Sequence, residues 1–299
     1  MTTAPAFGAW MAAVQATVEL ALEASLPPAS ASPAVLHQAM RHAVLDGGKR
    51  VRPLLVFAAG PLFDAPEGAL AQAATAVEMI HAYSLVHDDM PCMDDDALRR
   101  GKPTVHVRFG QAMALLAGDA LQAQAFAVLA APAAALPAQR QVAMLRLLAD
   151  AAGAGGMCGG QAIDLGSVGV TLKRQQLERM HRQKTGALLH AAVMLGAWCG
   201  RDLQHAEQAA LGRYADAVGL AFQVVDDVLD ATADSATLGK TAGKDAAANK
   251  PTYVSILGLA ASQALAERLC ADAQAALAPF GAGAQRLREL ANLIVQRKA

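Results

Sequence analysis

Charge of either sign is scarce in this chain of 299 residues. Only 17% of its residues are charged and the formal net charge is -1, so no overall positive field would attract a nucleic acid or an anionic membrane surface. Hydrophobic residues make up 54% of the chain, which is enough to fill a sizeable core. An anionic ligand must therefore be held by local clusters of basic residues.

Cysteine pairs, leader patterns and long apolar runs are also missing. The four cysteines are widely spaced and form no CxxC pair, which favours reduced thiols in a cytoplasmic protein: Cys92, Cys158, Cys199 and Cys270. No basic segment precedes an apolar core at the N-terminus, so a secretory signal is not expected. The closest approach to a membrane span, around Met113–Leu136, is interrupted by polar residues and by Pro132.

Alternating β-strand patterns are nearly absent, whereas Ala and Leu are abundant. The sequence predicts an all-α fold, a single-domain helical bundle over residues 1–299. Its expected helices cover residues 7–25, 33–46, 52–61, 68–90, 104–116, 118–131, 137–152, 174–200, 203–231, 252–275 and 284–297. The glycine-rich stretch Gly153–Gly160 follows no strand and lacks the GxGxxG spacing, so we interpret it as a flexible break between helices.

Two acidic clusters stand out in this apolar background. The first includes Asp88, Asp89, Asp94 and Asp95, and the second is Asp226, Asp227 and Asp230. Asp226 and Asp230 are four residues apart, so a helix places them on one face, where like charges repel. Burying such a pair is costly unless a cation intervenes.

The first cluster lies where an expected helix meets Pro91. Proline disfavours helical geometry at the residue before it and clashes with the carbonyl of His87. Asp88 and Asp94 are six residues apart and would not share a face of a regular helix. The break at Pro91–Cys92 must therefore bulge the chain and return Asp94 to the side of Asp88.

Carboxylate clusters without His or Cys partners are typical of Mg²⁺ sites that share their ions with substrate phosphates. One such cluster alone is equally well explained as a solvated acidic cap at a helix end. Two clusters, both ending apolar helices, favour cation binding. A calcium EF-hand is excluded, because the D-x-[DN]-x-[DN]-G pattern is absent.

Basic residues accompany both acidic clusters. A Gly-Gly turn at residues 47–48 precedes an expected helix start and delivers three cations there, an arrangement that favours a diphosphate. These cations and the basic residues that follow the clusters are Lys49, Arg50, Arg52, Arg99, Arg100, Lys102, Lys184, Lys240, Lys244 and Lys250. Each alone is more often a surface charge, but together with the acidic clusters they describe a site for two diphosphates.

Five segments form an ordered series between about residue 40 and residue 255: GGKRVRP, IHAYSLVHDDMPCMDDDALRRGKPT, GGQAIDL, KTGAL, and QVVDDVLD followed by LGK. This series resembles the trans-isoprenyl diphosphate synthases, most closely the bacterial farnesyl diphosphate synthases. The resemblance implies an all-α fold around a deep central cavity and a cytoplasmic homodimer. It also implies condensation of isopentenyl diphosphate with dimethylallyl or geranyl diphosphate, giving farnesyl diphosphate; geranyl and geranylgeranyl diphosphate are the alternative products.

The resemblance further implies roles for individual residues. Metal binding, with three Mg²⁺ ions bridged by the allylic diphosphate, falls to Asp88, Asp89, Asp94, Asp226, Asp227 and Asp230. The allylic diphosphate would be held by Arg99, Lys184 and Lys240, and the isopentenyl diphosphate by Lys49, Arg52, His81 and Arg100. Thr185 and Gln223 resemble the polar groups beside the reacting carbons, with Gln161 and Asp164 in support. His81 on its own is also explained as a core histidine.

The chain offers no nucleophile motif, since GxSxG and HExxH are both absent. The expected reaction is therefore ionisation of an allylic C–O bond, with metal ions and basic residues stabilising the leaving diphosphate. In the family, an aromatic residue at the position of Tyr83, together with the Pro91–Cys92 insertion, goes with a farnesyl product. Ser84 lies on the helix face of Asp88, whereas Tyr83 is rotated by ~140°, so a core role for Tyr83 is the alternative to a cavity floor.

Three other classes of protein compete with this interpretation. A terpene cyclase would share the fold and the first motif, but it normally lacks a second DDxxD and needs no Lys49–Arg52 turn. A non-catalytic regulatory subunit typically loses the aspartates or the basic anchors, which are complete here. A helical scaffold explains the fold but not the matched charges. We expect the basic tail, Gln296–Ala299, to be solvated, with closure over the isopentenyl site as the alternative.

Overall fold

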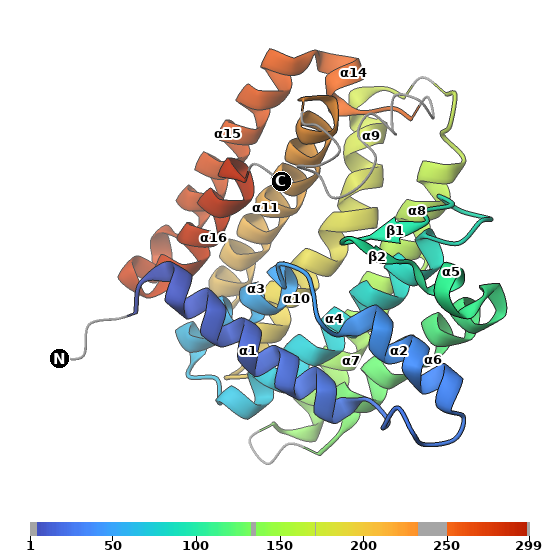
Figure 1. The fold of residues 1–299 in the computed structure, drawn as a ribbon. Coiled ribbons are helices and arrows are strands. Elements are labelled where there is room, and N and C mark those ends of the chain that lie inside the picture. Colours follow the sequence, from blue (N-terminus) through green and yellow to red (C-terminus); the bar gives the residue numbers. More distant parts are fainter. Residues whose placement is uncertain (1–4, 133–135, 171, 233–249, 298–299) are drawn as a thin grey trace.

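The computed structural model describes residues 5–132, 136–170, 172–232 and 250–297. The helices are α1 (Phe7–Ser25), α2 (Ala34–Val44), α3 (Val51–Ala59), α4 (Glu67–Asp88), α5 (Val105–Phe109), α6 (Gln111–Ala130), α7 (Ala138–Ala152), α8 (Met157–Leu165), α9 (Arg174–His181), α10 (Ala187–Trp198), α11 (His205–Thr232), α14 (Tyr253–Leu257), α15 (Leu259–Ala276) and α16 (Gln285–Gln296) (Figure 1). Shorter helical segments are η1 (Gly60–Phe63), η2 (Arg182–Gly186) and η3 (Ala278–Ala284). Within the described ranges the only strands, β1 (Leu98–Arg99) and β2 (Lys102–Pro103), form an antiparallel hairpin. The all-α prediction is confirmed.

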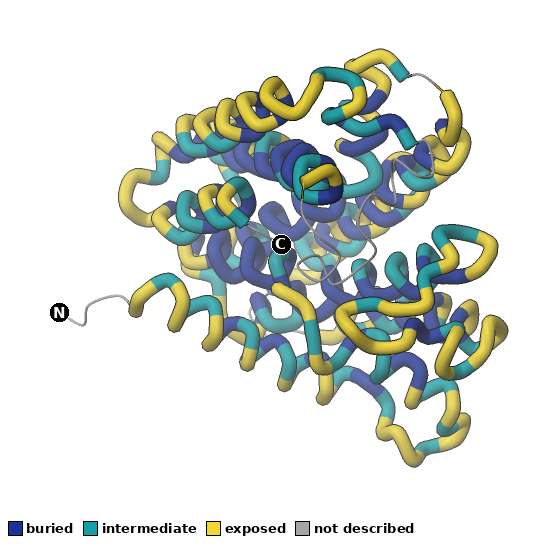
Figure 2. The backbone as a smooth tube through the Cα atoms, turned by 45° about the horizontal axis from the view of Figure 1, so that its top comes forward, coloured by how far each residue is buried: buried dark blue, intermediate teal, exposed yellow. Residues whose placement is uncertain are grey.

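Two apolar helices, α4 and α10, form the centre of the bundle. Nearly every residue of α10 is buried, as expected for a helix that is apolar all round. It packs against α3, α4, α7 and α11, and α4 packs against α3 and α6. A side chain at Gly196 would overlap the backbone of Val56, so this glycine allows α10 to approach α3 closely. In Figure 2 the buried residues follow these inner helices, and exposed residues follow the outer turns.

A second, smaller core lies under the end of α11. Leu220, Val224 and Val225 of α11 pack there with Leu265 and Leu269 of α15. Residues of α9 and α14 complete this core, and α14 lies beside the end of α11 (Figure 1). The packing fixes the direction in which α11 presents its acidic end.

The predicted break between helices 104–116 and 118–131 is wrong. The chain breaks at Gly110, whose φ of 87° favours glycine, and α6 then runs through Gly118 without interruption. Gly118 stays helical because its missing side chain makes room for the ring of His87. In the same way, the helix expected over 252–275 is divided at Gly258, which has a φ of 83°.

The interpretation of Gly153–Gly160 as a flexible break is also partly wrong. The break ends at Gly156, and α8 starts at Met157. A side chain at Gly160 would overlap the backbone of Lys184, so glycine there allows α8 to lie directly on η2. The expected helix 174–200 is observed as α9, η2 and α10 in succession, with η2 wound as a π-helix.

One described helix, α6, is long and apolar enough to span a membrane by length and composition alone, and a third of its most apolar window is buried. It packs along α4 and also against α2, α5 and α7, as a helix of the bundle does. Its outer face presents Leu115 and Leu116, which are 48% and 46% exposed.

Arg50 supports the fold instead of joining the cations that the Gly-Gly turn was expected to deliver. Its guanidinium is buried and donates to Glu78 Oε1 at 2.8 Å, to Glu19 Oε2 at 2.7 Å and to the carbonyl oxygen of Val44 at 2.6 Å. The side chains of Arg50 and Glu78 are each 3% exposed. This pair joins the turn before α3 to the middle of α4.

Replacing Glu78 with Ala should therefore destabilise the protein strongly, because it leaves the Arg50 charge buried beside only one carboxylate. Breaking a buried ion pair costs about 3–5 kcal/mol of unfolding free energy. Urea denaturation followed by circular dichroism measures the loss. The matched control, Asp150→Ala, removes an exposed pair with Arg146 and should cost less than about 1 kcal/mol. Equal effects of the two substitutions would contradict the assignment.

Candidate active site

The loop after α4 folds back on itself as the proline break predicts. The N–H of Asp94 donates to the carbonyl oxygen of Asp88 at 2.8 Å, and the N–H of Asp95 donates to that of Met90 at 3.2 Å. Asp95 adopts a positive φ of 50°, which closes the turn. The predicted return of Asp94 to the side of Asp88 is confirmed.

Asp88 is held in an unfavourable environment for a carboxylate. Burial is the main cause that raises its pKa, to about 6, and the charges of Asp94 and Asp89 add to it, while Lys184 and Arg99 oppose the shift. Asp89 and Asp94 belong to the loop after α4, Arg99 to β1 and Lys184 to η2. A carboxylate whose charged form is destabilised in this way is typical of a site that binds a cation.

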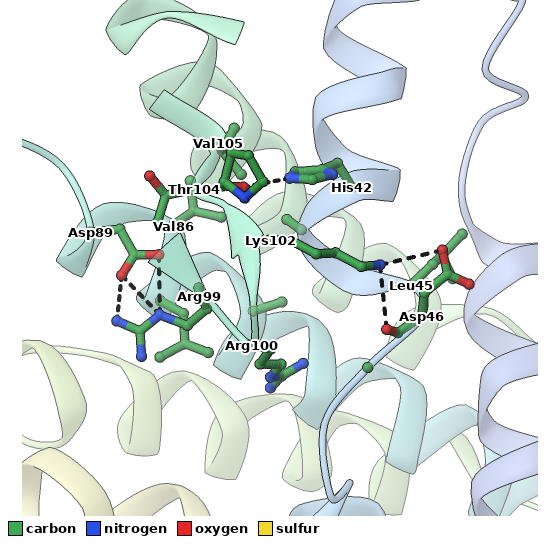
Figure 3. A pocket seen from close by; sticks show the side chains of 15 residues that line it. His42, Leu45, Asp46, Val86, Asp89, Arg99, Arg100, Lys102, Thr104 and Val105 are labelled. Carbon is green, nitrogen blue, oxygen red and sulfur yellow. Dashed lines mark hydrogen bonds and ion pairs between the residues drawn. The ribbon is translucent and has the colours of Figure 1, made fainter. Parts of the chain in front are cut away.

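Asp89 lines a small cavity beside the hairpin and is hydrogen-bonded there to Arg99. Arg99 Nε donates to the two carboxylate oxygens of Asp89 at 2.9 and 3.2 Å, and its Nη2 donates to the same group. A small cavity of about 50 Å³ lies here between α2, α4 and the hairpin, and Lys102 closes its other side by reaching Asp46 (Figure 3). The pair fixes Arg99 at the edge of the first acidic cluster.

A chain of hydrogen bonds orders the second acidic cluster. Thr185 Oγ1 donates to Gln223 Oε1 at 3.1 Å, and Gln223 Nε2 donates to Asp227 Oδ1 at 3.0 Å. The backbone N–H of Tyr253 donates to Asp227 Oδ2 at 2.7 Å, so both oxygens of this buried carboxylate are occupied by protein donors. The structure thus brings Thr185 and Gln223 together, as the family resemblance implied, and adds Asp227 to them.

A short segment, 250–253, joins the two clusters. Lys250 Nζ donates to Asp94 Oδ1 at 3.0 Å, and three residues later the N–H of Tyr253 binds Asp227. Three residues span at most about 11 Å between Cα atoms. The carboxylates at the end of α4 and at the end of α11, more than 130 positions apart in the sequence, therefore lie at the same end of the bundle.

Lys184 lies on the π-helical segment η2, a type of distortion that is frequent at functional sites. Its Nζ donates to Asp164 Oδ2 of α8 at 2.5 Å, across the close contact that Gly160 permits. Lys184 also acts on the charge of Asp88. Asp164 therefore positions Lys184 next to the first cluster. Beside this pair, both polar atoms of the Gln161 side chain are buried without a hydrogen-bond partner among the described residues.

Lys49, Arg52 and Arg100 form a group of crowded cations. Burial is the main cause that lowers the pKa of each, to about 10 for Arg52, and repulsion adds to it: from Arg297 on Lys49, from Arg100 on Arg52, and from Arg50 and Arg99 on Arg100. At Arg52 the attraction of Glu78 outweighs the repulsion by Arg100, so burial accounts for the lowered pKa. Arg100 lies over the Gly-Gly turn, since a Cβ at Gly48 would be 2.6 Å from its Cζ.

His81 faces the same group of cations from α4. Burial and the neighbouring charges of Arg52, Arg100, Arg99 and Arg50 hold its pKa well below the usual range, so the imidazole is neutral. The Nε atom of Arg52 is buried without a hydrogen-bond partner in the described part of the chain. A buried arginine with an unused donor, next to two further basic side chains, is what an anion-binding site requires.

Two basic residues to which the family resemblance gave no individual role reach the acidic clusters: Lys250, described above, and Arg297. Arg297 Nη2 donates to Asp226 Oδ1 at 2.5 Å and its guanidinium lies over the ring of Phe222 at 3.9 Å. The expectation of a solvated tail is therefore wrong for Arg297, because the amphipathic α16 directs it onto α11. Lys240 and Lys244 lie outside the described residues.

Tyr83 is buried where α4, α6 and α8 meet. Its hydroxyl lies 3.5 Å from Cys158 Sγ of α8 and interacts with Gln122 of α6, and its ring contacts His87 edge to face. Burial raises the pKa of this hydroxyl. Ser84 instead bonds the carbonyl oxygen of His81 at 2.9 Å, on the side of the helix that faces the cations.

The residues present fit Mg²⁺ that is shared with a phosphate ligand. Within the described ranges, no three His, Cys, Asp or Glu side chains are gathered closely enough to bind a metal by themselves. The donors are all carboxylates, and Asp230 Oδ1 is buried without a hydrogen-bond partner among the described residues. Mg²⁺ characteristically takes one or two carboxylates and completes its shell with water and substrate phosphates.

Comparison with known proteins gives a consistent result. Residues 33–277 match the family model described as polyprenyl synthetase. The chain is 50% identical to the probable farnesyl diphosphate synthase of Sinorhizobium fredii, over 94% of this chain and 85% of that protein. It is 46% identical to the chloroplastic geranylgeranyl pyrophosphate synthase of Catharanthus roseus, over 89% and 74%.

Solved structures agree with the sequence comparison. An FPP/GFPP synthase from Zymomonas mobilis has a TM-score of 0.88 at 40% identity, covering 97% of this chain and 98% of that one. A geranyltransferase from Helicobacter pylori, complexed with magnesium and isoprenyl diphosphate, has a TM-score of 0.84 at 29% identity, covering 98% of both chains.

Replacing Asp88 with Asn should stabilise the metal-free protein. The folded-state pKa lies above the unfolded value, so the wild-type protein loses stability as pH rises from about 4 through 6. The gain from Asp88→Asn should thus be larger at pH 7.5 than at pH 5, with about 2–4 °C in thermal midpoint for each kcal/mol of strain removed. Thermal unfolding in EDTA tests this, with Asp272→Asn at an exposed position as control. A gain that did not depend on pH would refute the assignment.

Proposed function

This chain belongs to the polyprenyl synthetase family and is a prenyl transferase, and from its site we propose that it elongates dimethylallyl and geranyl diphosphate with isopentenyl diphosphate to give farnesyl diphosphate. The proposal is supported chiefly by the contacts that residues 250–253 make. This segment binds Asp94 of the first acidic cluster and Asp227 of the second, next to a separate group of crowded cations. Such a site suits one metal-bound diphosphate and one diphosphate held by basic residues.

The metal ligands in this proposal are Asp88 and Asp94 from one side and Asp226, Asp227 and Asp230 from the other. Bound Mg²⁺, three ions by family resemblance, supplies Lewis-acid stabilisation of the leaving diphosphate. Asp89 was predicted as a further ligand, and its tight pairing with Arg99 supports a role in positioning that arginine. Arg297 would leave Asp226 when a cation takes its place.

The two diphosphates would be held by different basic residues. Lys184 and Arg99 lie at the carboxylates and suit the allylic diphosphate, and Lys240 is proposed to join them. Lys49, Arg52, Arg100 and the neutral His81 suit the isopentenyl diphosphate, whose negative charge would stabilise the desolvated cations. Fixing both substrates in this way lowers the entropic cost of bringing two reacting carbons together.

The reaction proceeds without a protein nucleophile. The allylic C–O bond breaks as the cations take up the charge of the departing diphosphate. The double bond of isopentenyl diphosphate attacks the allylic cation, and the retained diphosphate accepts the proton that is then lost. Gln223, which donates to Asp227, and Thr185, which donates to Gln223, would border the reacting carbons. A site closed to water would prevent quenching of the cation.

We propose that the chain acts as a cytoplasmic homodimer. The apolar outer faces of the neighbouring helices α6 and α7 support a dimer surface there: Leu115, Leu116 and Val142 are 48%, 46% and 64% exposed. Exposed apolar patches of this kind commonly mark contacts with another chain.

Incubation of the purified protein with isopentenyl and dimethylallyl diphosphates and Mg²⁺ tests the proposed function directly. Farnesyl diphosphate should form, and EDTA should abolish its formation. No condensation would remove the proposal, and a longer main product would favour the geranylgeranyl alternative. Farnesyl diphosphate supplied alone should yield nothing, whereas a terpene cyclase would convert it into a hydrocarbon.

Product length should depend on Tyr83, which we propose closes the far end of the substrate cavity that the family resemblance implies. It lies five residues before Asp88, about 7.5 Å along the helix axis from the diphosphate end. Tyr83→Ala should open space toward Cys158 and shift the product toward geranylgeranyl diphosphate, as measured by chromatography with mass detection. Tyr214→Phe removes a hydroxyl buried elsewhere in the core and should leave product length unchanged. An unchanged farnesyl product from Tyr83→Ala would assign Tyr83 to the core alone.

A further inference from the structure

Lys250 occupies an unusual place for a lysine. It comes from the C-terminal half of the chain, and its Nζ reaches Asp94 across a sequence separation of 156 residues. Both side chains are largely shielded from water, at 17% and 24% exposed. A charge-assisted hydrogen bond in such surroundings is stronger than an exposed ion pair, and it restricts both partners.

Local contacts constrain the segment that bears Lys250. Pro251 fixes its own backbone and favours extended geometry at Lys250. Thr252 caps α14 by accepting a hydrogen bond from the N–H of Ser255 at 3.1 Å, and Ser255 accepts one in return from the N–H of Thr252 at 3.0 Å. The next residue, Tyr253, is fully buried.

The segment 250–253 is therefore held at both ends. One end holds a carboxylate of the first acidic cluster through Lys250, and the other holds Asp227 of the second cluster through the N–H of Tyr253. The distance between Asp94 and Asp227 is set by this link. Ions that bind carboxylates of both clusters together with one diphosphate require that distance to be constant.

From this geometry we propose that Lys250 is a positioning residue of the catalytic site. It holds Asp94 by one carboxylate oxygen and thereby fixes the spacing of the two acidic clusters. The positive charge also reduces the repulsion between Asp94 and Asp88 before metal binds. This inference rests on the proposed function for its catalytic consequence, and on the geometry alone for its effect on metal binding.

The test compares Lys250→Met, which keeps the length of the side chain and removes its charge, with Lys250→Arg, which keeps the charge. Calorimetric titration of Mg²⁺ in the presence of inorganic diphosphate measures metal binding without turnover. Loss of a residue that orients a metal ligand typically weakens binding by about 10–100-fold, and Lys250→Met should show at least the lower figure. Lys250→Arg should restore most of the binding, because arginine also donates to a carboxylate.

Steady-state kinetics supply a second measurement. In Lys250→Met, kcat should fall and the Mg²⁺ concentration needed for half-maximal rate should rise, while KM for isopentenyl diphosphate stays unchanged, because the cations that hold that substrate are not touched. Lys173→Met, the same change at an exposed lysine, should match the wild type in both assays. Where Lys250→Met does not fold, Lys250→Gln provides the same comparison.

The outcomes separate the two claims. Wild-type protein that binds Mg²⁺ with inorganic diphosphate but transfers no prenyl group would refute the proposed function and leave the role of Lys250 in metal binding standing. Lys250→Met with a lowered thermal midpoint but unchanged Mg²⁺ binding and kcat would show that Lys250 only stabilises the fold, and would overturn the inference.

Discussion

The structure depends on holding like-charged carboxylates together at one end of a helical bundle. Left alone, the acidic ends of α4 and α11 would repel one another and draw water into the apolar core. The protein gives each of several carboxylates its own internal partner instead. These pairs are Asp89 with Arg99, Asp94 with Lys250, Asp226 with Arg297, and Asp227 with the N–H of Tyr253. Among the described residues, the opposite charges that act on Asp88 are those of Lys184 and Arg99, and its raised pKa shows that they do not compensate for its burial.

The charged forms of the neighbouring basic residues are also destabilised. Desolvation lowers the pKa of Lys49, Arg52 and Arg100, and a neighbouring arginine repels each of them. Close packing keeps them in place: Arg100 lies on the Gly-Gly turn, and the turn is tied down by the buried pair of Arg50 and Glu78. Destabilised negative and positive charges therefore lie at the same end of the molecule. Mg²⁺ would stabilise the carboxylates, and phosphate groups would stabilise the basic residues. The same end would therefore be the least stable part of the metal-free protein and the part most affected by substrate.

Local patterns in the sequence were enough to predict the helical fold, and proline chemistry predicted the bulge that returns Asp94 to Asp88. Packing of glycines could not be predicted in this way. Gly110 breaks the chain while Gly118 and Gly160 remain in helices, because the difference lies in what each glycine touches: solvent, His87 or the backbone of η2. Family resemblance indicated that Thr185 and Gln223 belong together, whereas nothing in their spacing did.

Long-range partners explain the remaining differences. Arg50 looked like one of three cations in a phosphate-binding turn, but a positive φ directs its side chain into the core, toward Glu78. Lys250 and Arg297 looked like isolated surface charges, because the carboxylates that they bind are 156 and 71 positions away. Sequence motifs identify groups that act on substrate more readily than groups that hold other side chains in place.

Anomalous scattering from crystals grown with Mn²⁺ and inorganic diphosphate addresses the central claim most directly. The account predicts Mn²⁺ ions bound by Asp88 on one side and by Asp226 on the other, all in contact with a single diphosphate. Ions confined to one acidic cluster, or a diphosphate bound only by the basic residues, would contradict it.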